Sequence, residues 1–343
     1  MKALILTEYH RLEYGEMPEP QVGPGEVLLQ VKACGICGSD IHGIDGSTGR
    51  RIPPIVMGHE ACGEIVKLGE GVKGYAIGDK VTFDSTIYCG KCHYCRRGQI
   101  NLCNNRRVLG VSCTEYRQHG AFAEYVAVPQ HILYPIPAGL SFERAAMVEP
   151  LSIAFHAVRR TPLVLDDAVV VVGAGTIGLL LIQSLRAAGC GLIVAVDVEQ
   201  HKLDLALQLG ADHAFDAGRT DVPEEVLHLT ERRGAEAAFE AVGLDSTFKT
   251  ALGCLKKGGS LTLIGNIASS IDMALQSVVT REITLYGCCA SSGEYPACLN
   301  MMARGTINVD VLISAVAPLS EGAHWFKRLY NKEKGLFKVI LKP

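Results

Sequence analysis

The sequence predicts an α/β protein in two domains, one rich in β-strands and one built on a doubly wound parallel sheet. Its 343 residues exceed what one compact core normally holds. Up to about residue 150, short apolar runs such as Glu26–Val31 alternate with Gly- and Pro-rich turns, a pattern typical of short strands. Beyond Ala145, continuous apolar runs alternate with helical stretches, as in parallel strands that are covered on both faces.

The expected elements follow from these patterns in chain order. Met1–His10 should form a first strand, because it lacks the long apolar stretch and cleavage site of a signal peptide. Arg281–Gly287 is expected to be an edge strand, and Leu336–Leu341 should form the last strand. The predicted strands of the parallel sheet are Val169–Val172, Leu192–Val196, Ala237–Phe239 and Leu261–Ile264.

Composition excludes several classes of protein. The net charge of −3 favours neither nucleic acid nor an anionic membrane as a partner. No apolar run approaches the roughly 20 residues that a membrane span needs. Thirteen cysteines in a long chain without a signal peptide suggest reduced thiols and metal ligands. We therefore expect a cytoplasmic protein.

A glycine-rich turn predicts a dinucleotide site. Val169–Val172 runs into Gly173–Gly178 (G-x-G-x-x-G), and an apolar helix follows over Leu179–Ala188. This context allows the pyrophosphate to approach the backbone at a helix N-terminus. Asp197 ends the next predicted strand, where a carboxylate accepts hydrogen bonds from the ribose hydroxyls and repels the extra phosphate of NADP. The predicted NAD-binding residues here are Gly173, Gly175, Thr176, Ile177, Gly178 and Asp197.

Four cysteines in one polar segment predict a structural zinc site. The spacing C-x2-C-x2-C-x7-C can close a tetrahedral thiolate shell with no open position. A nucleic-acid-binding finger is disfavoured because the second C-x2-C pair and a basic excess are both missing. The predicted ligands are Cys89, Cys92, Cys95 and Cys103.

A second zinc site needs ligands from distant segments. His59 and Glu60 supply nitrogen and oxygen, which suit a zinc ion with one position free for chemistry. Cys37 lies in a Gly-containing loop that could bring a thiolate into a cleft, and Cys34 is the rival thiol. Taken alone, each of these residues, like Glu149, would more often be structural than catalytic.

Together these motifs resemble the zinc-dependent medium-chain dehydrogenases/reductases, the alcohol dehydrogenase superfamily. The matching segments are Cys37–Asp40, Gly58–Glu60, the four-cysteine lobe, Gly173–Gly178 with Asp197, and Glu149–Ser152. The Glu-Pro-Leu-Ser stretch is similar to the sorbitol (polyol) and threonine dehydrogenase branches, and the C-terminal Gly-Leu-Phe-Lys-Val-Ile-Leu resembles the polyol branch.

The resemblance implies roles for individual residues. Cys37 and His59 would bind the catalytic zinc, and Glu60 and Glu149 would complete its shell directly or through water. Asp40 would orient His59 as a hydrogen-bond acceptor. Three further roles are implied: Ser39 would take the proton of the alcohol, His42 would pass it to solvent, and Lys202 would contact the adenosine ribose.

The implied reaction is hydride transfer from a secondary alcohol of a polyol, sugar acid or polyol phosphate to NAD. Sorbitol itself is disfavoured, because the Arg-Tyr pair of sorbitol-type enzymes has no counterpart in Gly287–Tyr295. Arg50 and Arg51 could recognise a carboxylate or phosphate, although two solvated surface arginines are an equal alternative. L-threonine 3-dehydrogenase is the second interpretation, and a non-catalytic zinc- or dinucleotide-binding protein is the third.

The expected architecture is a GroES-like catalytic domain over residues 1–152 and 290–343, with a structural zinc lobe at 86–106. A Rossmann domain over 153–289 would lie between the two parts. Because unpaired strand edges invite pairing, the edge strand at Arg281–Gly287 predicts a homodimer or homotetramer.

Overall fold

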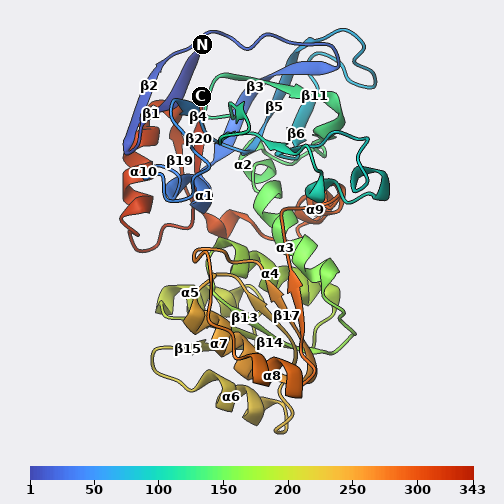
Figure 1. Ribbon diagram of the computed structural model, residues 1–343. Helices are drawn as coiled ribbons and strands as arrows, with labels where there is room; N and C mark the ends of the chain where they lie inside the picture. The colour runs from blue at the N-terminus through green and yellow to red at the C-terminus, as the bar shows by residue number, and fades with distance from the viewer. The chain divides into compact units, whose positions relative to one another are not determined.

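The computed structural model describes residues 1–343, which divide into two compact units (Figure 1). Unit 1 comprises Met1–Glu149, Ser292–Gly305 and Val309–Pro343. Unit 2 comprises Pro150–Ser291 and Thr306–Asn308. Both ends of the chain belong to unit 1, so its sheet joins segments that are far apart in sequence. No helix has the length and apolar character needed to span a bilayer.

Unit 1 is rich in β-strands, as its short apolar runs predict. It also holds four α-helices and five single 3-10 turns. The strands are β1 (Lys2–Glu8), β2 (Arg11–Glu16), β3 (Glu26–Gly35), β4 (Ile55–Val56), β5 (Glu60–Leu68), β6 (Lys80–Phe83), β7 (Thr86–Ile87), β8 (Arg107–Val108), β9 (Val111–Ser112), β10 (Arg117–Gln118), β11 (Tyr125–Pro129), β12 (Leu133–Pro135), β19 (Ile313–Pro318) and β20 (Lys338–Lys342). The helices are α1 (Gly38–Ile41), α2 (Phe142–Ala145), α9 (Tyr295–Ala303) and α10 (Gly322–Tyr330), and the turns are η1 (Cys95–Arg97), η2 (Ile100–Leu102), η3 (Gln130–Ile132), η4 (Asp310–Leu312) and η5 (Leu319–Glu321).

The largest sheet of unit 1 has seven strands in the order β12-β6-β5-β3-β20-β19, and β11 also pairs with β3. The C-terminal strand β20 is antiparallel to β3, with Ile340 opposite Gly35. Gly35 is in turn opposite Glu60 at the start of β5. The last strand of the chain is therefore brought next to the segments predicted to bind the catalytic metal.

The core of unit 1 is apolar and continuous. Buried side chains from the first strands pack with others from the C-terminal segment, including Leu4, Leu29 and Leu341. Phe122 and Phe326 meet edge to face, with ring centroids 5.6 Å apart. These contacts fix the C-terminal segment on the N-terminal sheet.

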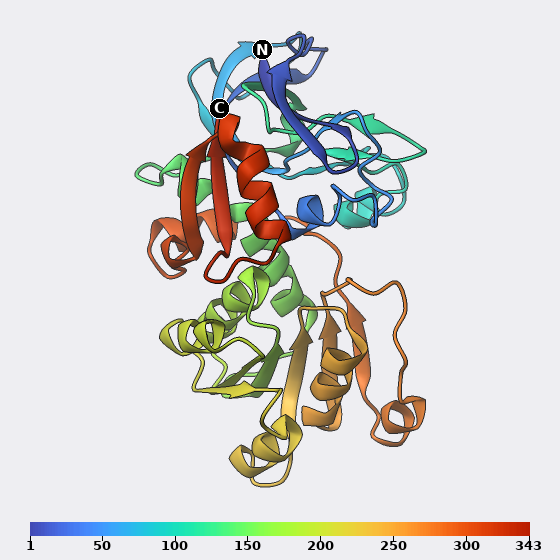
Figure 2. The ribbon, with the colours of Figure 1, turned by 90° about the vertical axis from the view of Figure 1, so that its left-hand side faces the viewer.

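Unit 2 is a parallel sheet with helices on both faces (Figure 2). The strand order β15-β14-β13-β16-β17-β18 runs outward in both directions from β13, which is the pattern of a doubly wound fold. The chain enters unit 2 within α3, after Glu149. The elements are α3 (Val148–Arg160), β13 (Ala168–Val172), α4 (Thr176–Ala188), β14 (Leu192–Asp197), α5 (Gln200–Gln208), β15 (His213–Asp216), α6 (Val222–Leu229), β16 (Ala235–Glu240), α7 (Asp245–Cys254), β17 (Leu255–Leu263), α8 (Leu275–Thr280) and β18 (Thr284–Gly287).

The central strands of unit 2 are almost completely buried. Val169, Val170 and Val171 of β13 are fully shielded from solvent, as are Ile193 and Ala195 of β14. Continuous apolar runs suit such strands because neither face meets water. The predicted α/β class, with a doubly wound parallel sheet, is confirmed.

Candidate active site

Three possible metal ligands from separate segments of unit 1 converge. The ligand atoms of Cys37, His59 and Glu60 all lie within 4.8 Å of one another. Cys37 precedes the first residue of α1, and Glu60 begins β5. Cys34 is fully buried and stands outside this group. The choice between the two thiols therefore falls on Cys37.

Two glycines make this convergence sterically possible. Gly58 has φ +94°, and a Cβ there would lie 2.9 Å from the backbone nitrogen of Phe122. A Cβ at Gly35 would lie 2.3 Å from the Glu60 carboxylate. A side chain at either position would collide with these atoms, so the glycines leave the space in which the His59–Glu60 segment packs.

The neighbours of His59 favour a positive charge at its ring. Asp40 is fully buried, and its Oδ1 lies 3.5 Å from His59 Nδ1, which is itself buried without a hydrogen-bond partner. Burial lowers the pKa of His59, but the charges of Asp40 and Cys37 outweigh it and hold that pKa well above its usual range. With Nδ1 facing Asp40, the other ring nitrogen is the one available to a metal.

Asp40 is held as a carboxylate by two neighbours. Burial favours the neutral acid, but His59 and Arg51 lower the pKa of Asp40 to about 2. Arg51 Nη2 donates to Asp40 Oδ1 at 3.0 Å. The Cys37 thiolate, the His59 imidazole and the Glu60 carboxylate lie close enough together to fit a zinc ion, and the Asp40 carboxylate lies beside His59.

Glu60 also forms an ion pair with Lys338, a residue that the sequence analysis did not single out. Lys338 Nζ donates to both oxygens of the Glu60 carboxylate, at 2.7 and 2.6 Å, and to the carbonyl oxygen of Ile36 at 2.9 Å. Both Glu60 and Lys338 are buried. Burial lowers the pKa of Lys338, but the charge of Glu60 outweighs it and raises the pKa.

Glu149 lies outside the compact group of three. It is half-buried in the first turn of α3 and interacts electrostatically with His59 and Glu60. Burial raises the pKa of Glu149 to about 7, because the charge of Glu60 adds to its effect and the charge of His59 only partly offsets it. Its position suits a fourth ligand that enters or leaves the metal.

The proposed proton-relay residues lie on α1. Ser39 Oγ donates to Cys37 Sγ at 3.3 Å and accepts from Arg51 Nη2 at 3.3 Å. Ser39 itself is exposed, and His42, at the C-cap of the same short helix, is also exposed. The serine hydroxyl is therefore fixed beside a metal ligand, and the histidine faces solvent.

The two arginines expected to bind an anionic substrate have different positions. Arg50 is exposed, but Arg51 is only 4% exposed and its guanidinium binds Asp40 and Ser39. Because Arg51 donates four hydrogen bonds to groups inside the protein, Arg50 is the more accessible of the two for an anionic substrate. The two residues are adjacent in sequence, and nothing in the sequence indicates which of them is buried.

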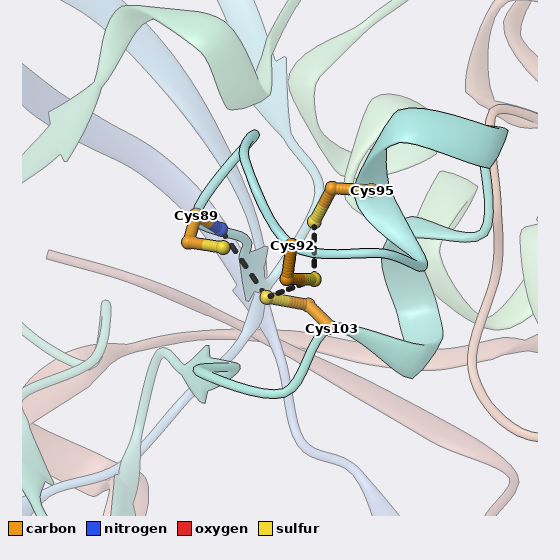
Figure 3. Close-up of side chains that lie close together, drawn as sticks. All are labelled: Cys89, Cys92, Cys95 and Cys103. Carbon is orange, nitrogen blue, oxygen red and sulfur yellow. Dashed lines mark hydrogen bonds between the residues drawn. The ribbon is translucent and has the colours of Figure 1, made fainter.

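The four-cysteine lobe brings its thiols together in unit 1 (Figure 3). Cys92 Sγ lies 3.5 Å from Cys95 Sγ and 3.9 Å from Cys103 Sγ. A tetrahedral shell with zinc–sulfur bonds of about 2.3 Å needs sulfur atoms about 3.8 Å apart. Backbone N–H groups of Lys91 and Cys92 lower the pKa of the Cys89 thiol to about 6, which favours a thiolate ligand. The lobe therefore fits a closed zinc site.

In unit 2, the glycine turn joins β13 to α4. Gly173 has φ +99°, and a Cβ at Gly178 would lie 1.8 Å from the Gly173 carbonyl oxygen. Thr176 and Ile177 form the first turn of α4, with Gly175 as its N-cap. Backbone N–H groups of this turn can therefore approach a phosphate closely.

Asp197 lies at the end of β14, next to this turn. Its Oδ2 accepts from Ala174 N at 2.7 Å, and its Oδ1 accepts from Val198 N at 2.8 Å. Lys202 forms an ion pair with Glu199, a neighbour that sequence reasoning did not single out, and lies 3.9 Å from Asp197. Two carboxylates are thus placed where an adenosine ribose would bind.

Comparison with known proteins agrees with these two sites. Residues 23–138 match the family described as alcohol dehydrogenase GroES-like domain, and residues 176–304 match zinc-binding dehydrogenase. A sorbitol dehydrogenase of Halalkalibacterium halodurans is 36% identical, with 100% of this chain and 99% of that protein covered. D-arabitol-phosphate dehydrogenase of Enterococcus avium is 32% identical, over 94% of this chain and 91% of that protein.

Solved structures show the same likeness. Galactitol-1-phosphate dehydrogenase of Escherichia coli superposes with a TM-score of 0.93 at 26% identity, with all of both chains covered. The first family match contains Cys37, His59, Glu60 and the four-cysteine lobe, and the second begins at Thr176, within the dinucleotide turn. The chain therefore belongs to the zinc-binding dehydrogenases that carry an alcohol dehydrogenase GroES-like domain, with zinc and NAD as its cofactors.

Proposed function

We propose that this protein oxidises a secondary alcohol of a polyol, sugar acid or polyol phosphate and transfers the hydride to NAD. The observation that carries the proposal is the group of Cys37, His59 and Glu60 beside the fixed hydroxyl of Ser39. The relatives named above act, by name, on sorbitol, arabitol phosphate and galactitol 1-phosphate, which supports this substrate class.

The metal would be held by Cys37 and His59, with Glu60 and Glu149 as exchanging carboxylates. When bound, zinc supplies Lewis-acid polarisation of a hydroxyl, and NAD supplies the hydride acceptor. Asp40 keeps the His59 ring in one orientation through Nδ1. Lys338 holds both oxygens of Glu60, and we assign to Glu149, in the first turn of α3, the place of the carboxylate that exchanges at the metal.

The proton of the alcohol would leave through α1. Ser39 Oγ donates a hydrogen bond to Cys37 Sγ and accepts one from Arg51 Nη2, which leaves a lone pair to accept from the substrate hydroxyl. As Ser39 takes the proton of the alcohol, it would turn its own proton away from Cys37 and release it. His42 is exposed at the end of the same helix, and its imidazole can both accept and release a proton. We assign it the transfer of this proton to solvent.

NAD would bind to the glycine turn of unit 2, with Asp197 on the adenosine ribose. Backbone N–H groups orient the carboxylate of Asp197, and Glu199 adds a second negative charge nearby. Both charges would repel the extra phosphate of NADP. Lys202 would contact the ribose, and its ion pair with Glu199 would hold the ammonium in place.

Arg50 is the remaining candidate for contact with an anionic substrate. It is exposed and lies within electrostatic range of Glu115 and Tyr116. A guanidinium there could form paired hydrogen bonds to a phosphate or carboxylate. The phosphate-bearing substrates in the names of two relatives support this assignment.

A homodimer or homotetramer is the expected assembly. Strand β18 is the edge of the six-stranded sheet and offers unpaired backbone groups to a second copy. A location in the cytoplasm also remains a prediction, supported by thirteen cysteines that are all free thiols.

The proposal is tested by NADH formation in zinc-loaded protein. The substrate panel contains neutral polyols, polyol phosphates, sugar acids, L-threonine and simple alcohols, each with NAD and with NADP. The expected result is NAD-dependent oxidation of a polyol-class compound that stops on chelation and returns with zinc. Oxidation of L-threonine alone, or silence of the whole panel with both zinc sites filled, would contradict it.

A further inference from the structure

Arg51 is built into the interior of unit 1 as a buried cation. Its side chain is 4% exposed. A Cβ at Gly43 would lie 2.3 Å from the Arg51 Cγ, so the absence of a side chain at Gly43 makes room for the arginine. The backbone on either side is tied to one strand: Ser112 N donates to Arg50 O and Ile52 N donates to Ser112 O. These contacts fix where the guanidinium lies.

All three nitrogens of this guanidinium are used. Nε and Nη2 donate to Asp40 Oδ1 at 3.3 and 3.0 Å, and Nη2 also donates to Ser39 Oγ at 3.3 Å. Nη1 donates to the carbonyl oxygen of Arg50 at 3.0 Å. The planar fork of an arginine can make these bonds together, whereas the single ammonium of a lysine cannot.

The two side chains that accept hydrogen bonds from Arg51 each contact a different metal-ligand candidate. Asp40 Oδ1, which receives the arginine, also lies 3.5 Å from His59 Nδ1. Ser39, which receives the same Nη2, donates to Cys37 Sγ at 3.3 Å. One buried cation therefore orients both the nitrogen and the sulfur side of the metal group.

We propose that Arg51 is a positioning residue that sets how firmly zinc is held by His59 and Cys37 and where the Ser39 hydroxyl points. The inference rests on the proposed function only for the role of Ser39; the effect on zinc holds for any reaction at this site. Without the guanidinium, the buried carboxylate of Asp40 loses the two hydrogen bonds that Arg51 donates to it, and Ser39 loses one of its two hydrogen bonds. Both metal ligands then lose their orientation.

The first test measures zinc release to a chromogenic chelator from Arg51→Gln, Arg51→Lys and the parent protein. Partners of metal ligands typically change metal affinity or activity by about 10- to 100-fold. Arg51→Gln should therefore speed release of one zinc per chain by about that factor, while the zinc of the cysteine lobe leaves at the parent rate. Arg51→Lys, which keeps the charge but not the fork, should fall between the two.

A matched control is Arg117→Gln. Arg117 is an exposed arginine of the same region whose Nε donates to Ser112 Oγ, and it contacts neither Asp40 nor Ser39. Its zinc release and its turnover of a neutral polyol should match the parent protein. A general loosening of this loop would instead speed release in both variants, which would overturn the specific role of Arg51.

A double-mutant cycle keeps the test decisive if Arg51→Gln folds poorly. Asp40→Asn removes the charge that Arg51 balances, and Arg51→Met is made both alone and in that background. If Arg51 acts on zinc mainly through Asp40, Arg51→Met should change zinc release much less in the Asp40→Asn background than in the parent protein, and the remaining effect measures the route through Ser39 and Cys37. Full additivity of the two changes would refute this route.

Kinetics separate positioning from substrate binding. Arg51→Gln reloaded with zinc should lower kcat through Ser39 with similar KM changes for neutral and anionic substrates. A selective rise in KM for phosphates or carboxylates, with normal zinc release, would return Arg51 to substrate recognition. If no alcohol is oxidised at all, the proposed function fails, but zinc release still decides the role of Arg51.

Discussion

The buried ion pair between Lys338 and Glu60 should be one of the most sensitive points of unit 1. The side chains are 4% and 1% exposed, and the ammonium binds both carboxylate oxygens. Replacing Lys338 by Met keeps the length but leaves Glu60 as an uncompensated buried charge. Breaking a buried pair in this way typically costs about 3–5 kcal/mol.

The matched control is Lys342→Met. Lys342 lies on the same strand and pairs with Glu143 at 2.7 Å, but the two side chains are 49% and 26% exposed. Exposed pairs of this kind contribute about 0–1 kcal/mol. The double variant Lys338→Met/Glu60→Gln should recover most of the loss, because no buried charge then remains.

The assay is urea unfolding followed by the fluorescence of Trp325, the only tryptophan of the chain, which lies on α10 in unit 1. The measurement is made with excess zinc and again after chelation. The deficit of Lys338→Met should be larger after chelation, because zinc near Glu60 replaces part of the lost positive charge. Equal losses for Lys338→Met and Lys342→Met would refute the reasoning.

Three further predictions concern the other sites. Gly178→Ala should lower the melting temperature of the protein, because its Cβ would lie 1.8 Å from the Gly173 carbonyl oxygen. Gly175→Ala, whose Cβ would have no atom within 4 Å, should fold normally but bind NAD less tightly. Thermal unfolding with and without NAD separates the two variants, and equal melting temperatures would contradict the steric argument. Cys92→Ser should reduce the zinc content by one ion per chain and lower thermal stability while the other zinc stays bound, as measured by atomic absorption; loss of both ions would argue against two independent sites. Asp197→Ser should raise the KM for NAD about 10- to 100-fold, since hydrogen bonds to a charged group contribute about 1.5–3 kcal/mol. It should also lower the ratio of kcat/KM for NAD to kcat/KM for NADP. If this ratio does not change, Asp197 does not select between the two cofactors.

Local patterns predicted what depends on neighbouring residues. The glycine turn, the helix after it and Asp197 lie within one strand-helix-strand segment, so their spacing in sequence nearly determines their arrangement in space. The four cysteines of the zinc lobe are likewise confined to one short segment, which holds their thiols together once its 3-10 turns form.

Contacts that depend on strand pairing could not be predicted in this way. Lys338 and Glu60 are 278 residues apart in sequence. They meet because β20 pairs with β3, and β3 with β5, which places Ile340, Gly35 and Glu60 in one row. No periodicity in the sequence encodes this order of strands, so the partner of Glu60 was missed.

The two adjacent arginines show a second limit. A strand-like segment sends neighbouring side chains to opposite sides, so one of Arg50 and Arg51 had to point inward. Which one does so depends on the backbone pairing with Ser112 and on the space above Gly43. Their shared charge suggested a shared role, whereas the structure separates a buried partner of Asp40 from an exposed side chain.

The most direct test of the account follows the hydride itself. The polyol substrate is prepared with deuterium on the carbinol carbon that becomes the carbonyl. It is incubated with NAD and zinc-loaded protein, and the nicotinamide product is analysed by mass spectrometry. The account predicts that the label appears in NADH and that removal of the Cys37–His59 zinc abolishes the transfer. Label released to water, or transfer that survives loss of this zinc, would contradict a zinc-dependent hydride transfer to NAD.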